Sequence, residues 1–573
     1  MSHPANASII RGMSNPAHGR DARYATTTSR RGFLVGVSLL AIGPALTARA
    51  QATPQAGGPT VVTGSKRKVD ATSSGEQRLR LAGPVVDPVT IDPAGINDIT
   101  TAFLARQVFA GLVRFDEDLN PIPDLAQRIE ISEDGLTYRF ELWPDATYAD
   151  GTPIVADDVV KAISRALNPQ DGTPISDRSG PTFLSDIAGA DQLVSGEAVT
   201  LTGATVIDDR TLELALTAPQ ATFLMKLAAP QAAVADPRDV AKGGDWWKSP
   251  NASGPFKVGA WKPGEQLLLA ANDRYVLGRP TLDNVDLRLG PSASNAWNLF
   301  QAGQIDAADV PINALDSVLD PASPLASTLV KVPYFSTEYI AFRTDVEPLD
   351  DPHVRRAILL AYPRDKVAEV TLAGRAEPGD SFIPPGMLGR DWPSVLPDHD
   401  VEAARQEIAK SRYGSADKVP AIEIYAANPT FPQSLRDVLK QDLGLTVDVI
   451  DVEWQTFMKG LGQQSFPAYD LSWIADYPDP ENFLGFLFGT GSASNYSGYS
   501  NPAFDALLDE AALTLDTDAR ADLYAKAQDV LLGDNVVLPL YHDVRYSLVK
   551  PTVHGYHIPP IGVLELDGVW IQQ

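Results

Sequence analysis

The stretch from Ile422 to Ile450 constrains the fold more than any other part of this sequence. It begins with alternating apolar residues, as in a strand, and then carries apolar residues at helical spacing from Leu435 to Leu443. Gly444 is suited to end that helix, and apolar alternation resumes directly after it. A strand, a helix and a second strand in succession favour parallel strand pairing. The sequence therefore predicts an α/β fold.

Other segments predict antiparallel sheet beside the parallel one. Residues 136–142 and 212–216 alternate apolar with polar side chains, which is typical of strands with one buried face. Two helix starts are also marked, because Asp351-Pro352 and Asn501-Pro502 each place a capping residue before a first-turn proline. The expected class is thus α/β with mixed sheets.

Length and composition narrow the kinds of function. With 573 residues the chain is too long for one ordinary core. It contains no cysteine, which excludes disulfides, thiolate metal sites, a cysteine nucleophile and a lipid-bearing N-terminal cysteine. A net charge of −26 disfavours nucleic acid as a partner. Such a charge suits cationic ligands, and it serves solubility equally well.

The N-terminus has the features of an export signal. Residues 11–31 are rich in arginine, 33–46 are apolar, and small residues follow at 48–50. The apolar run is shorter than the ~20 residues that span a bilayer. Residues 29–34, Ser-Arg-Arg-Gly-Phe-Leu, resemble the twin-arginine signal. We therefore expect 1–52 to be a twin-arginine-type signal peptide, cleaved near Ala50–Ala52, and 53–76 to be a flexible linker.

No catalytic or metal-binding motif stands in this sequence in the context that it requires. The sequence lacks the nucleophile-elbow, dinucleotide and zinc-protease patterns, and no cofactor is expected. His554 and His557 lie three residues apart, but the neighbouring prolines and Gly555 predict extended chain, so surface histidines are expected. Paired carboxylates need no local signature, so a hydrolase is not excluded. Taken together, the missing motifs and the export signal favour a binding protein over an enzyme.

Several ordered segments resemble one known family. The first group consists of residues 90–94 (TIDPA), 108–113 (VFAGLV), 123–126 (PDLA), 132–138 (SEDGLTY), 150–153 (DGTP) and 156–160 (ADDVV). The later group consists of residues 251–256 (NASGPF), 354–357 (VRRA), 475–480 (ADYPDP) and 499–505 (YSNPAFD). Together they are similar to the bacterial extracellular solute-binding proteins of family 5, which include dipeptide, oligopeptide and nickel receptors. The resemblance covers essentially all of 77–573.

The resemblance implies a two-lobed periplasmic-binding-protein fold with a central cleft. Lobe one, with an extra subdomain, would comprise residues 77–335, and lobe two would comprise 336–543. Residues 544–573 would return to lobe one. It also implies a periplasmic receptor of an ABC importer that closes its lobes on a peptide or peptide-like solute. The expected partners are that ligand and the membrane permease subunits, and the expected state is a monomer.

The family's motifs also imply site residues. Residues 473–476 match the Trp-x-x-Asp stretch, in which the aspartate holds a peptide's amino terminus, so Asp476 is the expected amine partner and Trp473 a pocket wall. Alternatively, Asp476 has only a structural role and caps the turn in which it lies. Asn97 and Ile99 match a cleft-lining loop. Phe183 either lines the pocket or packs in the core.

Many relatives have Phe-Asn-Thr where this chain has Phe-Arg-Thr, so Arg343 places a charge near the expected crossing between lobes. That arginine is either solvated or pairs with an anion. Arg375 and Arg390 are candidates for a ligand carboxylate only because such a group needs a guanidinium. Within the family, the alternative ligands are a sugar, an opine-like compound or a nickel chelate; a sensor or chaperone subunit is a further alternative.

Overall fold

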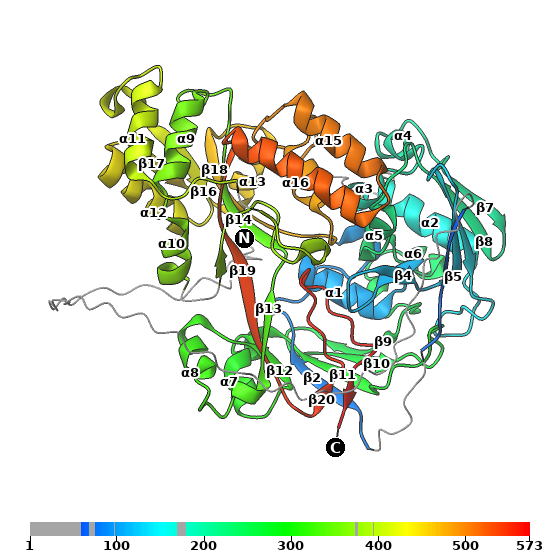
Figure 1. Ribbon diagram of the computed structural model, residues 1–573. Coiled ribbons are helices and arrows are strands. Elements are labelled where there is room, and N and C mark those ends of the chain that lie inside the picture. Colours follow the sequence, from blue (N-terminus) through cyan, green and yellow to red (C-terminus); the bar gives the residue numbers. More distant parts are fainter. Residues whose placement is uncertain are drawn as a thin grey trace. The chain divides into compact units, whose positions relative to one another are not determined.

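The structure, a computed structural model, describes residues 59–67, 75–96, 98–168, 179–372, 376–393 and 395–572. In these residues the strands form one large mixed sheet, one antiparallel sheet and two small hairpins (Figure 1). The helices are α1 Ile99–Val108, α2 Ala156–Leu167, α3 Gly180–Leu184, α4 Ala190–Val194, α5 Phe223–Leu227, α6 Pro237–Val240, α7 Ala296–Gln301, α8 Leu315–Leu319, α9 Pro352–Ala361, α10 Arg364–Thr371, α11 Val401–Lys410, α12 Thr430–Val438, α13 Trp454–Gly462, α14 Leu484–Phe488, α15 Pro502–Leu513 and α16 Thr517–Gly533.

The large sheet joins segments that lie far apart in the sequence. Its order is β17 (Val447–Asp451), β16 (Ile422–Ala426), β18 (Ala468–Ile474), β14 (Ser336–Phe342), β19 (Val537–Val549), β12 (Ala307–Asp309), β2 (Arg78–Ala82), β11 (Asn284–Arg288), β10 (Gln266–Ala271) and β9 (Phe256–Lys262). β13 (Leu329–Pro333) and β15 (Ala376–Pro378) also pair with β19. β16 and β17 are parallel and α12 connects them, which confirms the predicted unit. Gly444 ends the helical segment at φ 74°, as expected.

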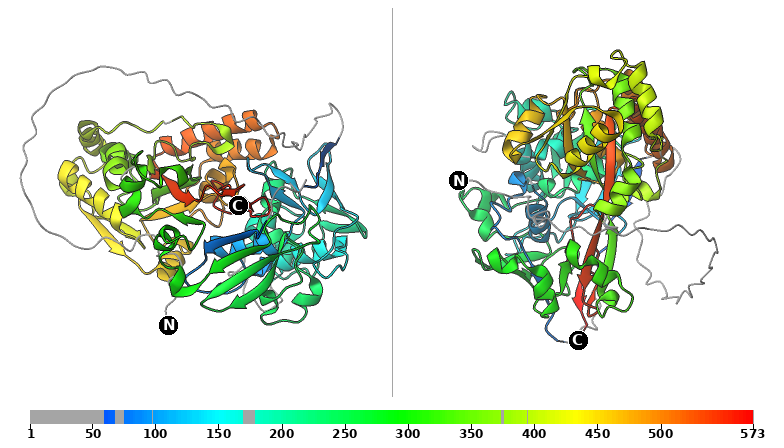
Figure 2. Two further views of the ribbon diagram at one scale, coloured as in Figure 1. Left: turned by 90° about the horizontal axis from the view of Figure 1, so that it is seen from below. Right: turned by 90° about the vertical axis from the view of Figure 1, so that its left-hand side faces the viewer.

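β19 connects the two halves of this sheet. Its residues Val537–Asp543 pair with β14 and β15, and Val544–Val549 pair with β12 and β13. The strand is 13 residues long, which corresponds to about 44 Å of extended chain. Figure 1 and the right-hand view of Figure 2 show it, in orange to red, running from one half to the other. The same strand therefore contributes Leu538 to one hydrophobic core and Leu548 to another.

The antiparallel sheet has the order β1 (Thr60–Thr63), β5 (Ala126–Ile131), β6 (Thr137–Leu142), β8 (Thr211–Ala215) and β7 (Ala204–Asp208). The remaining strands form the hairpins β3 (Val113–Phe115) with β4 (Pro121–Pro123) and β20 (Val553–His554) with β21 (Trp570–Ile571). Tyr138 and Phe140 on β6 are buried, whereas Arg139 is exposed and pairs with Glu213 across the sheet, which confirms the predicted alternation.

One segment differs from the sequence prediction. We expected 53–76 to be a flexible linker, but Thr60–Thr63 forms β1 on the edge of β5. Backbone hydrogen bonds to an edge strand need no apolar composition, and Val62 also packs against the adjacent core. Arg67 pairs with Asp567, 2.6 Å away, which fixes this residue as well. The expected signal peptide, residues 1–52, lies outside the described residues.

The turn at residues 251–256 gives a first prediction. A Cβ on Gly254 would lie 2.8 Å from the backbone nitrogen of Phe109, closer than such contacts allow. We expect Gly254→Ala to lower the free energy of unfolding by about 1–3 kcal/mol, measured by urea denaturation. Gly462→Ala is the control, because a Cβ there meets no atom within 4 Å. Equal stability of the two variants would contradict the prediction.

Candidate functional site

The expected binding stretch begins at the end of β18 and is held by one buried side chain. Asn482 accepts hydrogen bonds through Oδ1 from the backbone N–H of Asp476, at 2.9 Å, and from Nε1 of Trp473, at 3.0 Å. Its Nδ2 donates to Oδ2 of Asp476 at 3.3 Å. Asp479 caps the short helical turn Pro480–Asn482 by accepting from the backbone of Glu481. The local sequence thus fixes both candidate residues through Asn482.

The carboxylate of Asp476 is unusual in its environment. The residue is solvent-accessible and lines a partly open cavity. Burial among protein atoms raises the pKa of Asp476 to about 6, and the hydrogen bond from Asn482 opposes that rise. Among the described residues no lysine, arginine or histidine forms an ion pair with it. The site can therefore accept a cation.

The cavity beside Asp476 is small and charged. Its volume is about 100 Å³, and its lining includes Arg106, Arg114, Phe115 and His557 together with Asp476. Ligand pockets usually measure ~300–1,000 Å³, whereas this one has room for only a few water molecules at ~30 Å³ each. A peptide therefore requires the walls to separate.

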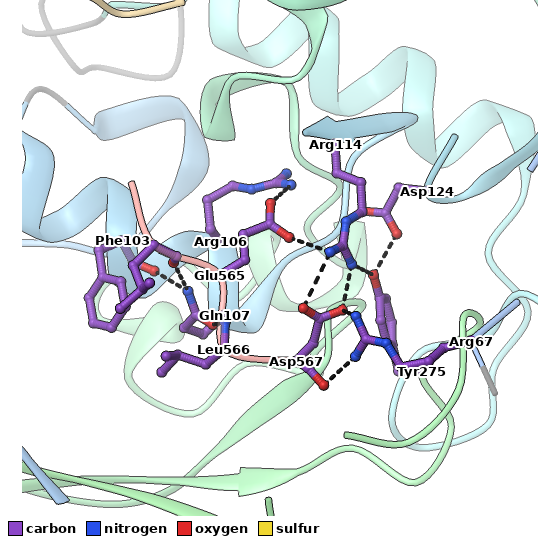
Figure 3. Close-up of polar contacts among 11 residues, drawn as sticks. Arg67, Phe103, Arg106, Gln107, Arg114, Asp124, Tyr275, Glu565, Leu566 and Asp567 are labelled. Carbon is purple, nitrogen blue, oxygen red and sulfur yellow. Dashed lines mark hydrogen bonds and ion pairs between the residues drawn. The ribbon is translucent and has the colours of Figure 1, made fainter. Parts of the chain in front are cut away.

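Part of the cavity wall belongs to a buried network that fastens the end of the chain (Figure 3). Arg114 pairs with Glu565 at 2.8 Å and with Asp567 at 2.5 Å, and Arg106 pairs with Glu565 at 2.7 Å. The arginines hold the pKa of Asp567 well below its usual range, although burial alone would raise it. In contrast, burial raises the pKa of Asp124 to about 6. This network is structural support for the cavity.

The other expected site residues differ in how far they are exposed and in what they contact. Trp473 is half-buried, and its ring lies 5.1 Å from that of Phe486. Ile99 is 43% exposed at the start of α1, beside Gly562 of the C-terminal segment. Phe183 is 5% exposed and packs in a hydrophobic core, so its side chain matches the packing alternative. Asn97 lies outside the described residues.

Arg343 does not lie where we expected. It follows the last residue of β14, at the opposite end of that strand from Ser336 and the connection to β13. Its guanidinium pairs with Asp345 at 2.6 Å and also donates to the backbone carbonyl of Gln464. Both partners belong to the stretch predicted as lobe two, so the expectation of a charge near the crossing is wrong. A seven-residue strand separates the two ends by about 23 Å.

Arg390, one of the two arginines considered for a ligand carboxylate, is not among the residues that line the cavity. Arg390 pairs with the exposed Asp522 at 3.0 Å, and its guanidinium lies 5.2 Å from the ring centre of Trp392. Arg375 lies outside the described residues.

Sequence reasoning missed two residues that position the site. Asn482 is one, and the only local signal is its place in the Asp-Pro turn that follows Asp476. Lys226 of α5 is the other. Lys226 is buried, and its Nζ lies 3.1 Å from Oδ2 of Asp186 and 3.7 Å from Oε2 of Glu481. Although burial lowers it, the two carboxylates raise the pKa of Lys226 overall. The lysine thus ties the turn of Asp476 to the α5 region.

The part of the chain that the structure describes contains neither a long apolar helix nor a cluster of metal ligands. No helix there is both long and apolar enough to span a membrane. Within the same residues, no group of three or more histidine, aspartate or glutamate side chains is arranged to hold a metal ion.

Comparisons with known proteins agree on one family. The family model described as bacterial extracellular solute-binding proteins, family 5, middle, matches residues 120–495. The periplasmic oligopeptide-binding protein OppA of Escherichia coli K12 is 28% identical over 486 residues, which cover 82% of this chain and 87% of that protein. The oligopeptide-binding protein OppA of Bacillus subtilis 168 is 26% identical over 518 residues, covering 87% and 94%.

Solved structures give the same result. The Escherichia coli murein tripeptide binding protein MppA superposes with a TM-score of 0.71 at 25% identity, covering 87% of this chain and 100% of that one. These relatives are named as binding proteins. The chain belongs to the bacterial extracellular solute-binding proteins of family 5 and has the two-lobed α/β fold of periplasmic binding proteins.

Proposed function

We propose that this protein is the periplasmic receptor of an ABC importer, and that it binds a peptide or peptide-like solute between its lobes without chemical turnover. The observation that carries the proposal is Asp476, a carboxylate that can pair with a cation and that Asn482 fixes at the wall of a partly open cavity. A peptide's ammonium group needs such a partner once it leaves water. The relatives named as oligopeptide- and tripeptide-binding proteins support this choice of ligand.

Lobe closure is the expected mechanism. The chain passes between the predicted lobes where β13 is followed by β14 and again along β19. A few residues at such connections can absorb a hinge motion while the packed cores stay rigid. The present cavity is too small for a tripeptide, so we expect the ligand to enter an open form and the lobes to close over it. The closed receptor, a monomer, would deliver the ligand to the membrane permease subunits.

The location follows from the N-terminal sequence. We propose that residues 1–52 direct export by the twin-arginine route and are removed near Ala50–Ala52. Because the chain has no cysteine, the mature protein would not carry a lipid on an N-terminal cysteine.

Two measurements test the function. Native mass spectrometry of protein purified from its own host should show a retained peptide, and titration calorimetry with tri-alanine should show saturable binding. The peptide should be recovered intact after incubation, because no turnover is expected. A retained sugar, opine-like compound or nickel chelate would overturn the peptide proposal. Hydrolysis of tri-alanine by the pure protein would overturn the receptor proposal.

A further inference from the structure

The tip of the hairpin β3–β4 carries a leucine in a backbone conformation that leucine rarely adopts. Asp116 and Asn120 close the hairpin, because the backbone N–H of Asp116 donates to the carbonyl of Asn120 at 3.0 Å. Between them Leu119 has φ 62°, and its N–H donates to the carbonyl of Asp116 at 3.1 Å. In three-residue hairpin loops the last position is left-handed and usually carries glycine or asparagine. A leucine there costs conformational energy, which its packing has to offset.

The polar groups of the turn hold its shape. Oδ1 of Asp116 accepts hydrogen bonds from the backbone N–H of Asp118 at 3.0 Å and from that of Asn120 at 2.8 Å. The side-chain amide of Asn120 also donates to both carboxylate oxygens of Asp116. Because all of these bonds lie within five consecutive residues, the left-handed conformation of Leu119 is fixed locally.

The side chain of Leu119 packs into a different core from the strand that precedes it. β3 contributes to the hydrophobic core that is formed mainly by residues within 94–277. Leu119 is 8% exposed and belongs to the core of 336–543, the stretch predicted as lobe two. Among the buried side chains of that core in the described residues, only Phe335 and Ile561 also come from outside this stretch. The tip of a hairpin predicted for lobe one thus packs into lobe two.

Tyr477 makes the reverse contact. It directly follows Asp476 in the stretch predicted as lobe two, yet it is 1% exposed and belongs to the core of 94–277. Its hydroxyl donates to Glu481, and Nζ of Lys226 lies 5.7 Å from the centre of its ring. The two predicted lobes therefore exchange one buried apolar side chain each.

Both exchanged side chains lie at the binding cavity. Leu119 lines it together with Asp476 and Phe115, and Phe115 packs against both cores. Tyr477 is joined to Asp476 by one peptide bond. Separation of the lobes, which a bound ligand needs in order to leave, would expose Leu119 and Tyr477 to water, and exposure of apolar surface is unfavourable.

We propose that Leu119 and Tyr477 form a latch that stabilises the closed lobes and slows the release of the ligand. The inference rests on the proposed function and deepens it, because it names the residues that set how long a ligand stays bound. The turn keeps Leu119 in its left-handed conformation whether the lobes are open or closed. Its packing into lobe two, in contrast, exists only in the closed form, so the latch acts on opening.

The test replaces Leu119 by asparagine, which suits a left-handed backbone but is polar. Stopped-flow tryptophan fluorescence should show that tri-alanine leaves Leu119→Asn at least about tenfold faster than the wild type, because the apolar contact that opposes opening is lost. Leu119→Gly keeps the turn and removes the side chain, so its release should be equally fast. Leu119→Met, which remains apolar and of similar size, should restore slow release.

Leu388→Asn is the matched control. Leu388 has φ 54°, is half-buried and packs against the core of 336–543, but it is not among the residues that line the cavity. The same substitution there should leave the release rate unchanged. Release that is accelerated as much in Leu388→Asn as in Leu119→Asn would overturn the latch, because the effect would then be a general loss of packing.

Small-angle X-ray scattering measures the latch without a ligand. Loss of a contact between the lobes favours the open form, so the radius of gyration of Leu119→Asn should exceed those of the wild type and Leu388→Asn. Equal release rates in Leu119→Asn and the wild type would overturn the latch and leave the receptor. If the wild type binds no tri-alanine, the peptide receptor fails and the radii decide the latch: a larger radius in Leu119→Asn supports it, and an equal radius overturns it.

Discussion

Replacing Asp567 by alanine is expected to lower the free energy of unfolding by about 3–5 kcal/mol. Asp567 is 2% exposed and pairs with Arg114 and Arg67 (Figure 3). Without Asp567, Arg114 keeps its ion pair with Glu565 but loses its more deeply buried carboxylate partner. Leaving N–H groups of a buried guanidinium without an acceptor lowers the stability of the folded state. The C-terminal segment would also lose one of its two ion pairs with Arg114 of β3. Urea denaturation followed by tryptophan fluorescence measures the change.

The pH dependence provides a second measure of the same pair. The arginines lower the pKa of Asp567 below its unfolded value of 3.8. Its contribution to stability is therefore complete above that value and is lost as the pH falls through the lower, folded pKa. Asp567→Asn should flatten this acid limb of the stability curve. Asp145→Ala is the control, because the Lys66–Asp145 pair is largely exposed and should matter little. An Asp567→Ala protein as stable as that control would contradict the argument.

This network also shows why part of the fold could not be predicted from the sequence. Strands such as β6 and helices such as α9 are encoded locally, by alternation and by a cap followed by proline, and both predictions are confirmed. Arg114 and Asp567 are 453 positions apart, and no local pattern relates them. β1 was missed for a similar reason, because its place depends on a free edge of β5.

The candidate site divides in the same way. The stretch from Trp473 to Asp476 could be predicted because it is one short motif whose order is read along the chain. Asn482, which holds both ends of that motif, makes its contacts through the shape of a turn. Arg343 was misplaced because the sequence does not show at which end of β14 the lobes connect.

Replacing Asp476 by asparagine is expected to weaken the binding of tri-alanine by about 2 kcal/mol or more, roughly 30-fold. The carboxylate is needed in its charged form to pair with an ammonium. Because burial raises the pKa of Asp476 to about 6, wild-type affinity should fall as the pH is lowered through that value. In the variant this loss of affinity should disappear. Calorimetry at about pH 7.5 and about pH 5 measures both effects. Asp448→Asn is the control, because Asp448 is an exposed residue on β17.

Although Asp476→Asn should bind tri-alanine more weakly, the ligand-free variant should be at least as stable as the wild type. This difference separates a role in binding from a role in the structure of the turn. Between the unfolded pKa of 3.8 and the folded value of about 6, the folded protein holds more protons than the unfolded chain. The folded protein therefore loses stability as the pH rises through this window and Asp476 ionises. Asparagine does not ionise, so the variant avoids this loss. The turn itself is capped by Asp479, which is unchanged. A residue that merely completes the turn would lose stability on substitution and leave affinity intact. Ligand-free Asp476→Asn that melts at or above the wild type and binds tri-alanine poorly identifies the carboxylate as part of the ligand site.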